Sequence, residues 1–489
     1  MHNDTIQLVE AAMNGAWEAF TIYGKKSLRE RAQLMRTIAT EIEALGDQLI
    51  ETAMAETHLP EARLKGERAR TVFQLNSYAD ACEAGHWLEA SIDTALPDKT
   101  PPKPDTRKMR VPLGPVVVFG AANFPFAYST AGGDTASALA AGCPVVVKAH
   151  PAHLQTSELV ASAVNKAVAS CGLPPSVFTH LYSAGNDIGQ ALVNHPHTKA
   201  VGFTGSFAGG KQLFDWANQR PVPIPVFAEM SSINPVFLLP EKLQMAAVET
   251  AQQYAASITL GVGQFCTNPG LIIGIESPAL QRFTEALAAA IQSIAPGTML
   301  HQGIADNYAA KRSAALSQPG VTTVASSQTA AAGNQGLPTI ATVHAKDFLA
   351  NPILQQEVFG PYSLLVVCKD REEMISVAKN LEGQLTATLM ATENDLQQHA
   401  SLVDAVSNLC GRLVLNGVPT GVEVCQSMQH GGPFPATTDS RFGSVGADAI
   451  KRFGRPLCYQ NWPNHLLPDE LKDENPLQIW RVVNNEMKR

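Results

Sequence analysis

The chain has 489 residues, of which 45% are hydrophobic and 16% are charged, and its formal net charge is −8. This length predicts two or three domains with sizeable cores, and the composition is that of a globular protein and not of a disordered one. The negative charge argues against a nucleic-acid-binding protein, because contacts to phosphates need a basic surface. No stretch is apolar for long enough to span a bilayer, so we expect no membrane partner.

The cysteines and the first residues bear on the cellular compartment. The eight cysteines form no C-x-x-C pairs, which disfavours a zinc ribbon or a disulfide framework and favours reduced thiols. The segment that begins with Met1 has neither the basic nor the apolar region of a secretory signal. Together these features predict a cytoplasmic protein.

The N-terminal half shows three patterns in succession. Residues 1–90 repeat apolar side chains every three or four positions, which predicts several amphipathic helices. In residues 91–112 prolines lie among charged side chains, which predicts a connector or an extended ribbon. In residues 113–228 short β-branched runs alternate with helical stretches, which is typical of a parallel sheet covered on both faces. We therefore predict a doubly wound nucleotide-binding domain from 1–90 and 113–228, with strands at 116–119, 145–147, 177–179 and 200–203 and helices at 131–141, 156–170 and 207–219.

A second alternating block predicts a second α/β domain at residues 229–430. Its expected strands are 236–238, 271–273, 363–367 and 413–415. The alanine-rich segment 325–333 is interpreted as a surface insertion. The aromatic-rich tail, residues 445–489, is expected to dock on the body of the protein or on a neighbouring subunit.

One cysteine has a setting that suits catalysis. Cys266 lies in the segment 261–270, which is rich in Gly and Pro and separates a helix-like run from an apolar, strand-like run. A thiol on a loop between rigid elements suits a nucleophile, which must reach the substrate while its position stays fixed. The alternative is a structural cysteine, because free cysteines are often buried. These residues alone leave both interpretations open.

Two segments are candidates for binding a nucleotide. Gly205 and Ser206 begin a GxxxxGK run, but Gln212 replaces the hydroxyl residue with which a P-loop holds magnesium. A glycine turn that opens a helix still suits dinucleotide phosphates, although the G-x-G-x-x-G fingerprint is absent. Lys148 ends an apolar strand, where a cation can meet a ribose or a phosphate, or is simply solvated.

Two acids and two histidines complete the set of polar candidates. Glu229 follows an apolar run, where partial burial would raise the pKa of its carboxyl group toward the range of a general base. Glu357 begins the run Glu-Val-Phe-Gly-Pro. Each acid taken alone is more typical of a helix end or a turn than of a catalytic site. His150 and His153 lie near each other without a carboxylate or a cysteine, so we expect surface histidines and no metal site.

Taken in order, these segments resemble the aldehyde dehydrogenase superfamily over nearly the whole chain. The matching segments are 114–125 (with Asn123), Lys148, 202–206, Glu229, 263–266 and 357–361. The resemblance implies an α/β fold with a doubly wound, Rossmann-like cofactor domain, a second α/β catalytic domain and a small oligomerisation ribbon. It also implies a homodimer or homotetramer, with residues 91–112 and the stretch near 457–460 as the ribbon.

The resemblance also implies a reaction. Cys266 would attack an aldehyde carbonyl, and the Asn123 side-chain amide and the Cys266 N–H would hold the resulting oxyanion. Oxidation by NAD or NADP would leave a thioester, and Glu229 would activate the water that hydrolyses it to a carboxylic acid. Glu229 also distinguishes the chain from acylating, CoA-dependent relatives.

The cofactor-binding residues follow from the same resemblance. It assigns Lys148 to the adenosine ribose or its phosphate, Gly205 and Ser206 to the helix start near the pyrophosphate, Glu357 to the nicotinamide ribose and Phe359 to the nicotinamide. Members that prefer NAD commonly carry an acid three residues after the lysine, and Pro151 occupies that place here. Without this acid, the 2′-hydroxyl loses a partner and a 2′-phosphate is not repelled. We therefore expect NADP to be preferred over NAD.

Three segments depart from the commonest family pattern: residues 230–233, 267–270 and 431–438. They are similar to the subgroup of α-ketoglutaric semialdehyde (2,5-dioxopentanoate) dehydrogenases and NADP-dependent fatty aldehyde dehydrogenases. We expect a small-molecule aldehyde substrate, 2,5-dioxopentanoate, which would be oxidised to 2-oxoglutarate. The alternatives are a fatty or general aliphatic aldehyde and, more remotely, a non-catalytic nucleotide-binding protein. Arg412 and Arg441 are candidates for binding the substrate carboxylate, and the sequence does not choose between them.

Overall fold

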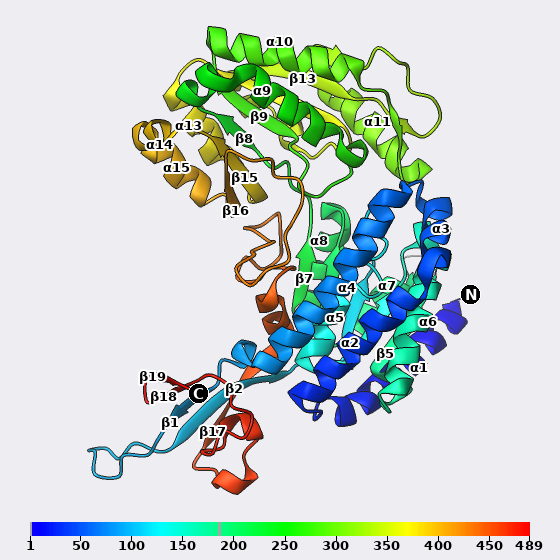
Figure 1. Ribbon diagram of the computed structural model, residues 1–489, viewed down its shortest axis with the longest axis vertical. Coiled ribbons are helices and arrows are strands. Elements are labelled where there is room, and N and C mark those ends of the chain that lie inside the picture. Colours follow the sequence, from blue (N-terminus) through cyan, green and yellow to red (C-terminus); the bar gives the residue numbers. More distant parts are fainter. Residues whose placement is uncertain (1, 184–186) are drawn as a thin grey trace.

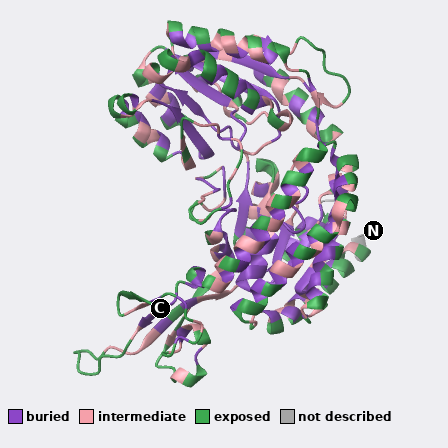
Figure 2. Cartoon of the chain, viewed as in Figure 1, coloured by how far each residue is buried: buried purple, intermediate pink, exposed green. Residues whose placement is uncertain are grey.

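The computed structural model describes residues 2–183 and 187–489. Figure 1 shows two α/β lobes, one above the other, and a third sheet that projects from the lower lobe. Figure 2 shows that the strands at the centre of each lobe are buried, whereas the projecting sheet is largely exposed or half-buried. Each lobe therefore has its own hydrophobic core.

The lower lobe is built on a five-stranded sheet whose order is β5-β4-β3-β6-β7 and whose neighbouring strands are all parallel. Its strands are β3 (Val116–Phe119), β4 (Val145–Lys148), β5 (Phe178–Leu181), β6 (Ala200–Thr204) and β7 (Val226–Glu229). The valine triplets of β3 and β4 are at most 1% exposed, as expected for strands that are covered on both faces. The expected strand at 177–179 begins later because a 3-10 turn, Pro175–Val177, precedes it.

Helices cover both faces of this sheet. They are α1 (His2–Tyr23), α2 (Leu28–Ala44), α3 (Gly46–Thr57), α4 (Glu61–Ala84), α5 (Gly133–Ala141), α6 (Leu154–Ser170), α7 (Asp187–Asn194) and α8 (Phe207–Gln219). Helix α2 begins at a capping box, in which Ser27 and Glu30 bond each other's backbone, and it buries an apolar stripe against α4 and α6. The N-terminal helices thus complete the lower lobe and form no separate unit.

The upper lobe is built on a seven-stranded sheet whose order is β11-β13-β14-β9-β8-β15-β16, with only the β11–β13 pair antiparallel. Its strands are β8 (Val236–Leu238), β9 (Leu271–Ile275), β11 (Thr322–Ser326), β13 (Thr339–His344), β14 (Tyr362–Cys368), β15 (Gln384–Met390) and β16 (Cys410–Leu415). Its helices are α9 (Pro240–Thr259), α10 (Pro278–Ser293), α11 (Gln302–Leu316), α12 (Ala345–Ala350), α13 (Arg371–Asn380), α14 (Glu393–Gln398) and α15 (Ala400–Ser407). A small ladder joins β10 (Gly297–Thr298) to β12 (Gln335–Gly336).

Two expectations for the upper lobe need correction. Strand β15 was not expected from the sequence, although every one of its residues is buried between β8 and β16. The segment 325–333 is a surface insertion only in part, because Ala325 is buried in β11 while residues 328–333 are exposed. In both cases the pairing partner, and not the local composition, decides the structure.

The projecting sheet has the order β17-β2-β1-β18-β19 and joins residues from the middle and the end of the chain. Its strands are β1 (Ser91–Asp93), β2 (Thr106–Pro112), β17 (Gly454–Gln460), β18 (Arg481–Val483) and β19 (Glu486–Lys488). Its expected role in oligomerisation and the expected limits of the three domains stay predictions. In the part of the chain that the structure describes, none of the helices is long and apolar enough to cross a bilayer.

The arrangement of the strands brings distant loops together. In the lower sheet the strand order reverses between β3 and β6, so the segments after β3, β6 and β7 open at one edge. The segment 416–446, orange in Figure 1, returns from β16 between the two lobes toward η6 (Ala447–Phe453). It meets the lower lobe where Met230 N–H donates to the carbonyl of Ala436, 2.8 Å away.

Candidate active site

The loop that carries Cys266 has an unusual backbone. Gly261, Val262 and Gly263, in η4 (Leu260–Gly263), have φ angles of +55°, +59° and +66°, in the left-handed region. A β-branched residue adopts this region only when its surroundings impose it. A Cβ atom added at Gly263 would overlap the carbonyl of Gly360, so glycine is required there for the two loops to touch.

Buried amide side chains hold the cysteine loop from below. Asn234 Nδ2 donates hydrogen bonds to the carbonyls of Cys266 and Asn268, both at 2.9 Å. Gln384 Oε1 in turn accepts from the backbone N–H groups of Ile233 (2.8 Å) and Asn234 (3.1 Å). Asn234 and Gln384 are at most 5% exposed. Sequence analysis did not identify either residue. The feature of the sequence that could have indicated them is a polar side chain next to a strongly apolar run.

The Cys266 thiol meets a histidine and a carboxylate. Cys266 Sγ lies 3.6 Å from His430 Nε2, and His430 Nε2 lies 3.0 Å from Glu229 Oε1. The Ser444 hydroxyl donates to Glu229 Oε2 at 2.6 Å, and Ser444 N–H donates to the His430 carbonyl at 2.7 Å. Glu229, the last residue of β7, is 3% exposed and His430 is 1% exposed. The lower sheet, the cysteine loop and the segment 416–446 thus meet at one point.

His430 and Ser444 were not found by sequence analysis. His430 lies 164 residues from Cys266, in a segment without regular structure. A single histidine between glycines and glutamines has no local pattern that separates it from a surface residue. Only the return of the segment 416–446 between the lobes reveals its role.

Burial and neighbouring charges raise the pKa of the Cys266 thiol and lower the pKa of the Glu229 carboxyl group. Burial raises the pKa of the Cys266 thiol well above its ordinary value, the negative charge of Glu229 raises it further, and Arg70 opposes the rise. Burial also works to raise the pKa of Glu229, but His430 and the Ser444 hydroxyl outweigh it and leave the pKa below its ordinary value. The expectation of a raised pKa at Glu229 is therefore wrong, because the carboxylate is buried together with partners that stabilise its charge.

Asn123 lies in the loop after β3 and reaches the cysteine loop. Its Nδ2 donates to the carbonyl of Gln264 at 3.1 Å, two residues before Cys266. The backbone carbonyl of Asn123 accepts a hydrogen bond from Arg63 Nη2 at 3.1 Å. The side-chain amide is thereby held against the cysteine loop from the lower lobe.

The residues expected to bind the adenosine side of the cofactor lie at the carboxyl edge of the lower sheet. Lys148 ends β4 and is half-buried, and burial lowers its pKa. No carboxylate of the described residues lies within ion-pair distance of its ammonium group. Gly205 N–H donates to the Glu229 carbonyl, and Ser206 caps α8 by accepting from Gly209 N–H. An unpaired cation beside a capped helix start fits a dinucleotide with a phosphate.

Glu357 and Phe359 lie on the other side of the cysteine loop. Both line a pocket that Ser232, Gly263 and Phe265 also line. Burial raises the pKa of Glu357 to about 7, although the Ser231 hydroxyl and the Ser232 N–H work to lower it. A carboxyl group whose pKa is raised by burial is suited to accept a hydrogen bond from a ligand hydroxyl.

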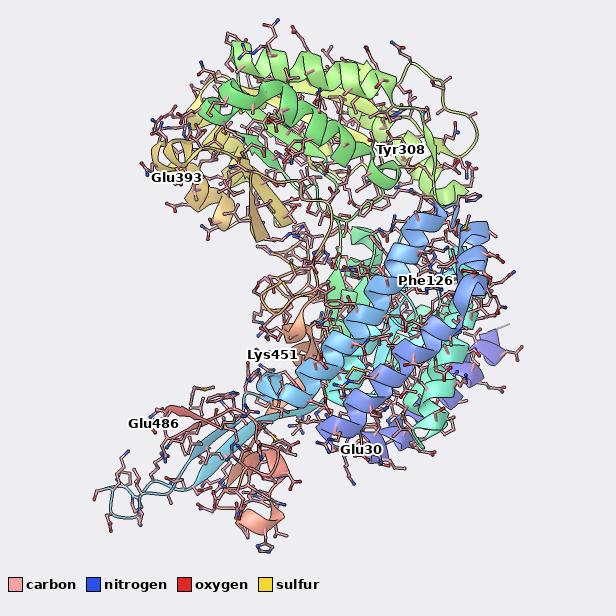
Figure 3. All side chains as sticks on the ribbon, in the orientation of Figure 1. Glu30, Phe126, Tyr308, Glu393, Lys451 and Glu486 are labelled. Carbon is pink, nitrogen blue, oxygen red and sulfur yellow. The ribbon has the colours of Figure 1, made fainter. Side chains whose placement is uncertain are left out.

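Tyr308, labelled in Figure 3, supports the loop of Glu357 from the upper lobe. Its hydroxyl donates to the carbonyls of Leu337 (2.6 Å) and Pro361 (3.2 Å). Its ring packs so closely on Gly360 that a Cβ atom there would overlap it. The Glu357 loop is therefore fixed on both sides, by Tyr308 and by Gly263.

The expected surface position of the two histidines near Lys148 is wrong for His153, which is fully buried. Its Nε2 lies 2.8 Å from the Ala121 carbonyl and its Nδ1 lies 3.1 Å from Ser157 Oγ. His150 is half-buried and its Nδ1 accepts from Ala152 N–H. Both imidazoles thus serve local hydrogen bonds at the start of α6.

Gly263→Ala tests the contact between the two loops. Alanine in the left-handed region costs about 1–2 kcal/mol, and here the methyl group must also displace the Gly360 carbonyl. We expect a clear fall of the melting temperature, measured by differential scanning calorimetry. Gly333→Ala is the matched control, because Gly333 has a φ of +57° with no atom within 4 Å of the added Cβ. Equal losses in both variants would contradict the contact.

The pH dependence of alkylation tests the charge coupling at the thiol. Because the folded-state pKa of Cys266 is raised, its thiolate should appear only as the pH rises beyond the ordinary thiol value of about 8.5. Glu229→Gln removes a negative charge that raises this pKa, so the midpoint should move to lower pH. Iodoacetamide labelling followed by mass spectrometry measures it, in a background that lacks the exposed Cys425 and Cys458. A midpoint that stays or rises would disprove the coupling.

Comparisons with known proteins identify the family of this chain. The model of the aldehyde dehydrogenase family matches residues 1–450. Alpha-ketoglutaric semialdehyde dehydrogenase 2 of Azospirillum brasilense is 53% identical over 475 residues, which cover 97% of this chain and 90% of that protein. The alpha-ketoglutaric semialdehyde dehydrogenase of Acinetobacter baylyi is 47% identical over 482 residues, 98% of this chain and 91% of that protein.

Solved structures show the same fold at low sequence identity. The crystal structure of the 1-pyrroline-5-carboxylate dehydrogenase from Thermus with bound NAD has a TM-score of 0.78 and 20% identity, over 93% of this chain and 85% of that one. This chain therefore shares the fold of that enzyme. A sequence identity this low shows nothing about the substrate of this chain. With a family model that covers most of its length and two relatives at about half identity, this chain belongs to the aldehyde dehydrogenase family.

Proposed function

We propose that this aldehyde dehydrogenase oxidises 2,5-dioxopentanoate, an aldehyde that carries a carboxylate, to 2-oxoglutarate with NAD or NADP. The two relatives at 53% and 47% identity are named for α-ketoglutaric semialdehyde, which is the same compound. The structural observation that supports this substrate is a cation whose charge acts on the thiol, Arg70. A fatty or general aliphatic aldehyde, the alternative substrate, has no charge for this cation to bind.

Arg70 lies on α4 and lacks an anionic partner. Its Nη2 donates to the Val422 carbonyl (3.2 Å) and to the Tyr128 hydroxyl (3.3 Å), and its Cζ lies 5.3 Å from the centre of the Tyr128 ring. Its Nη1 is buried and has no hydrogen-bond partner among the described residues. No described carboxylate lies within ion-pair distance of it, although the charge of the buried Glu67 acts on it from farther away, and a half-buried cation without a close anion is costly. A substrate carboxylate would supply the missing partner.

Of the two arginines considered from the sequence, only Arg412 is near the thiol. Its pKa is lowered by burial, and the charge of the Cys266 thiolate opposes that change. Its Nη1 and Nη2 donate to the carbonyls of Gly421 and Pro419, so it positions the segment that contacts Arg70. Arg441 is exposed and pairs with Asp439, which makes it unsuitable as an anchor.

The geometry of the cluster supports the covalent route expected from the family. His430 Nε2 is placed to take the proton of the Cys266 thiol, and the Glu229 carboxylate beside it stabilises the imidazolium. The thiolate then attacks the aldehyde carbon and gives a thiohemiacetal. Asn123 Nδ2 and the Cys266 N–H are the donors that we propose for its oxyanion.

The residues present fit a nicotinamide dinucleotide, for which Lys148, Gly205, Ser206, Glu357 and Phe359 are the proposed contacts. When bound, this cofactor accepts two electrons from the thiohemiacetal carbon, which becomes a thioester carbon. The half-buried position of Cys266 limits the access of water to the thioester. We propose that Glu229, aligned by Ser444, then accepts a proton from the attacking water and so releases the acid.

Transient kinetics test these roles. Cys266→Ala should bind cofactor but produce no NAD(P)H, because the nucleophile is missing. Glu229→Gln should still give a burst of NAD(P)H and an acyl-enzyme in intact-mass spectra, with turnover slowed by about 100-fold or more. Stopped-flow absorbance with 2,5-dioxopentanoate measures both. A burst in Cys266→Ala, or unchanged turnover in Glu229→Gln, would overturn the assignment, and silence of the wild type with every aldehyde would favour a non-catalytic protein.

Arg70→Met tests the substrate class. Loss of a charge-assisted contact of about 1.5–3 kcal/mol should lower kcat/KM for 2,5-dioxopentanoate by roughly 10- to 100-fold, mainly through KM. The kcat/KM for propanal and hexanal should change little, because these aldehydes carry no charge. Arg68→Met is the matched control, since Arg68 lies on the same helix but donates to the Gly46 carbonyl. Equal losses for charged and neutral aldehydes would contradict the role of Arg70.

We also propose that NADP is preferred over NAD. Pro151 is exposed at the start of the turn after β4, three residues beyond Lys148, and it brings no negative charge to that ammonium group. His150 beside it is shifted toward the neutral form, because burial lowers its pKa to about 3. Lys148 is thus the cation that would meet a 2′-phosphate.

The ratio of kcat/KM for NADP and NAD tests this preference. We expect a ratio above one in the wild type, and a preference of more than about tenfold for NAD, equal to 1.4 kcal/mol, would contradict it. Pro151→Glu should lower the ratio, because a carboxylate beside Lys148 repels the phosphate and can bind a 2′-hydroxyl. Pro151→Gln is the neutral control and should leave the ratio near its wild-type value.

A further inference from the structure

Three donor atoms of the active site form a compact triangle. Cys266 Sγ, His430 Nε2 and Glu229 Oε1 all lie within 4.8 Å of one another. They come from three separate segments, each held in place by its own contacts. Asn234 bonds the cysteine loop, and Ser444 bonds both the carboxylate and the segment of His430. The triangle therefore exists before any ligand arrives.

The sides of this triangle match the coordination of a metal ion. Zinc forms bonds of about 2.3 Å to sulfur and about 2.0 Å to nitrogen or oxygen. In a tetrahedral site these bond lengths place the sulfur and nitrogen ligands about 3.5 Å apart, and the nitrogen and oxygen ligands about 3.3 Å apart. The observed distances are 3.6 Å from Cys266 Sγ to His430 Nε2 and 3.0 Å from His430 Nε2 to Glu229 Oε1. Two sides of the triangle thus lie within a few tenths of an ångström of the zinc values, the third is no longer than 4.8 Å, and closing it would complete three ligands and leave the fourth position open.

The carboxylate is prepared for a cation. Glu229 Oε2 accepts the Ser444 hydroxyl, whereas the buried Glu229 Oε1 lies 3.0 Å from His430 Nε2 but receives no well-aligned hydrogen bond from the described residues. A buried carboxylate oxygen without a donor is costly, and a metal ion would satisfy it. The Ser444 hydroxyl would not bind the metal itself, but its hydrogen bond would orient the Glu229 carboxylate that does.

We propose that Cys266, His430 and Glu229 bind one Zn²⁺ ion in the cofactor-free enzyme and that this ion reversibly blocks the nucleophile. Binding breaks the S–H bond of Cys266, whose sulfur gives an electron pair to zinc, and the proton leaves to solvent. His430 binds through Nε2 and keeps its proton on Nδ1. With the thiolate and the carboxylate both engaged, neither attack on an aldehyde nor activation of water can occur.

The ligand types select the metal. A thiolate, an imidazole and a carboxylate favour Zn²⁺ or Co²⁺ over Mg²⁺ and Ca²⁺, which prefer oxygen ligands. Three ligands bind more weakly than the four of a structural zinc site. The Nδ1 atom of His430 also has no acceptor among the described residues, a contact that zinc-binding histidines normally make. A chelator should therefore remove the ion and restore activity.

The test uses the full-length enzyme, freed of metal by EDTA and dialysed, without cofactor. One equivalent of Zn²⁺ should slow alkylation of Cys266 by iodoacetamide at least about tenfold, Mg²⁺ should not, and EDTA should reverse the effect. One equivalent of Co²⁺ should give a thiolate charge-transfer band and the intense visible bands of a tetrahedral site. Zn²⁺ added to this enzyme before the cofactor and the aldehyde should also inhibit aldehyde oxidation at the same stoichiometry.

Variants identify the ligands. Cys266→Ser should abolish the cobalt charge-transfer band. His430→Asn should remove zinc protection, measured as the ratio of alkylation rates with and without Zn²⁺ at a pH high enough to form the Cys266 thiolate without this base. Ser444→Ala should weaken Co²⁺ binding by about 10- to 100-fold, as expected for a residue that orients a ligand. The double variant Cys425→Ser, Cys458→Ser removes the exposed thiols and should behave like the wild type. A band that persists in Cys266→Ser, or zinc that leaves alkylation unchanged, would overturn the proposal.

These measurements are independent of the proposed substrate. Metal binding and alkylation are followed without an aldehyde, so a different substrate would leave the zinc result unchanged. Conversely, an enzyme that oxidises 2,5-dioxopentanoate but binds no metal at this triangle would refute only the zinc site.

Discussion

The imidazole of His430, held between the buried Glu229 carboxylate and the Cys266 thiol, is the contact on which the active site depends. A carboxylate that is 3% exposed stays charged only if its neighbours stabilise that charge. His430 and Ser444 do so, and both belong to the segment that returns between the lobes. The lower sheet, the upper lobe and the returning segment must therefore be assembled together before the thiol has its environment.

The cysteine loop is fixed by backbone geometry and the carboxylate by charge. Three successive left-handed residues bring Gly263 against Gly360, and Asn234 bonds the Cys266 carbonyl from below. These contacts place the thiol without using its own sulfur atom. The sulfur thus remains available for chemistry, while burial and the charge of Glu229 raise the pKa of the thiol.

The cluster of Cys266, His430 and Glu229 can support both the reaction and its reversible inhibition. The thiol, imidazole and carboxylate that act as nucleophile and bases are also the groups that bind zinc. Arg70, whose charge acts on the thiol, is the residue that we propose for selectivity. It is a cation without an anionic partner, and a substrate with a carboxylate pays part of the cost of its burial. The proposed specificity and the proposed metal site thus both follow from charges that the protein alone leaves incompletely paired.

The sequence by itself determined the alternation of strands and helices and the carboxyl-edge position of Lys148, and it offered Cys266 and Glu229 as candidates, whereas Asn123 came only from the resemblance to a known family. Local periodicity and ordered motifs carry this information, because neighbouring residues share one element. His430, Ser444, Asn234 and Arg70 could not be predicted, since each acts through a partner far away in the chain. Strand β15 and the lowered pKa of Glu229 were not predicted from the sequence for the same reason. Only the tertiary structure decides them, because pairing, burial and charge depend on which distant segments meet.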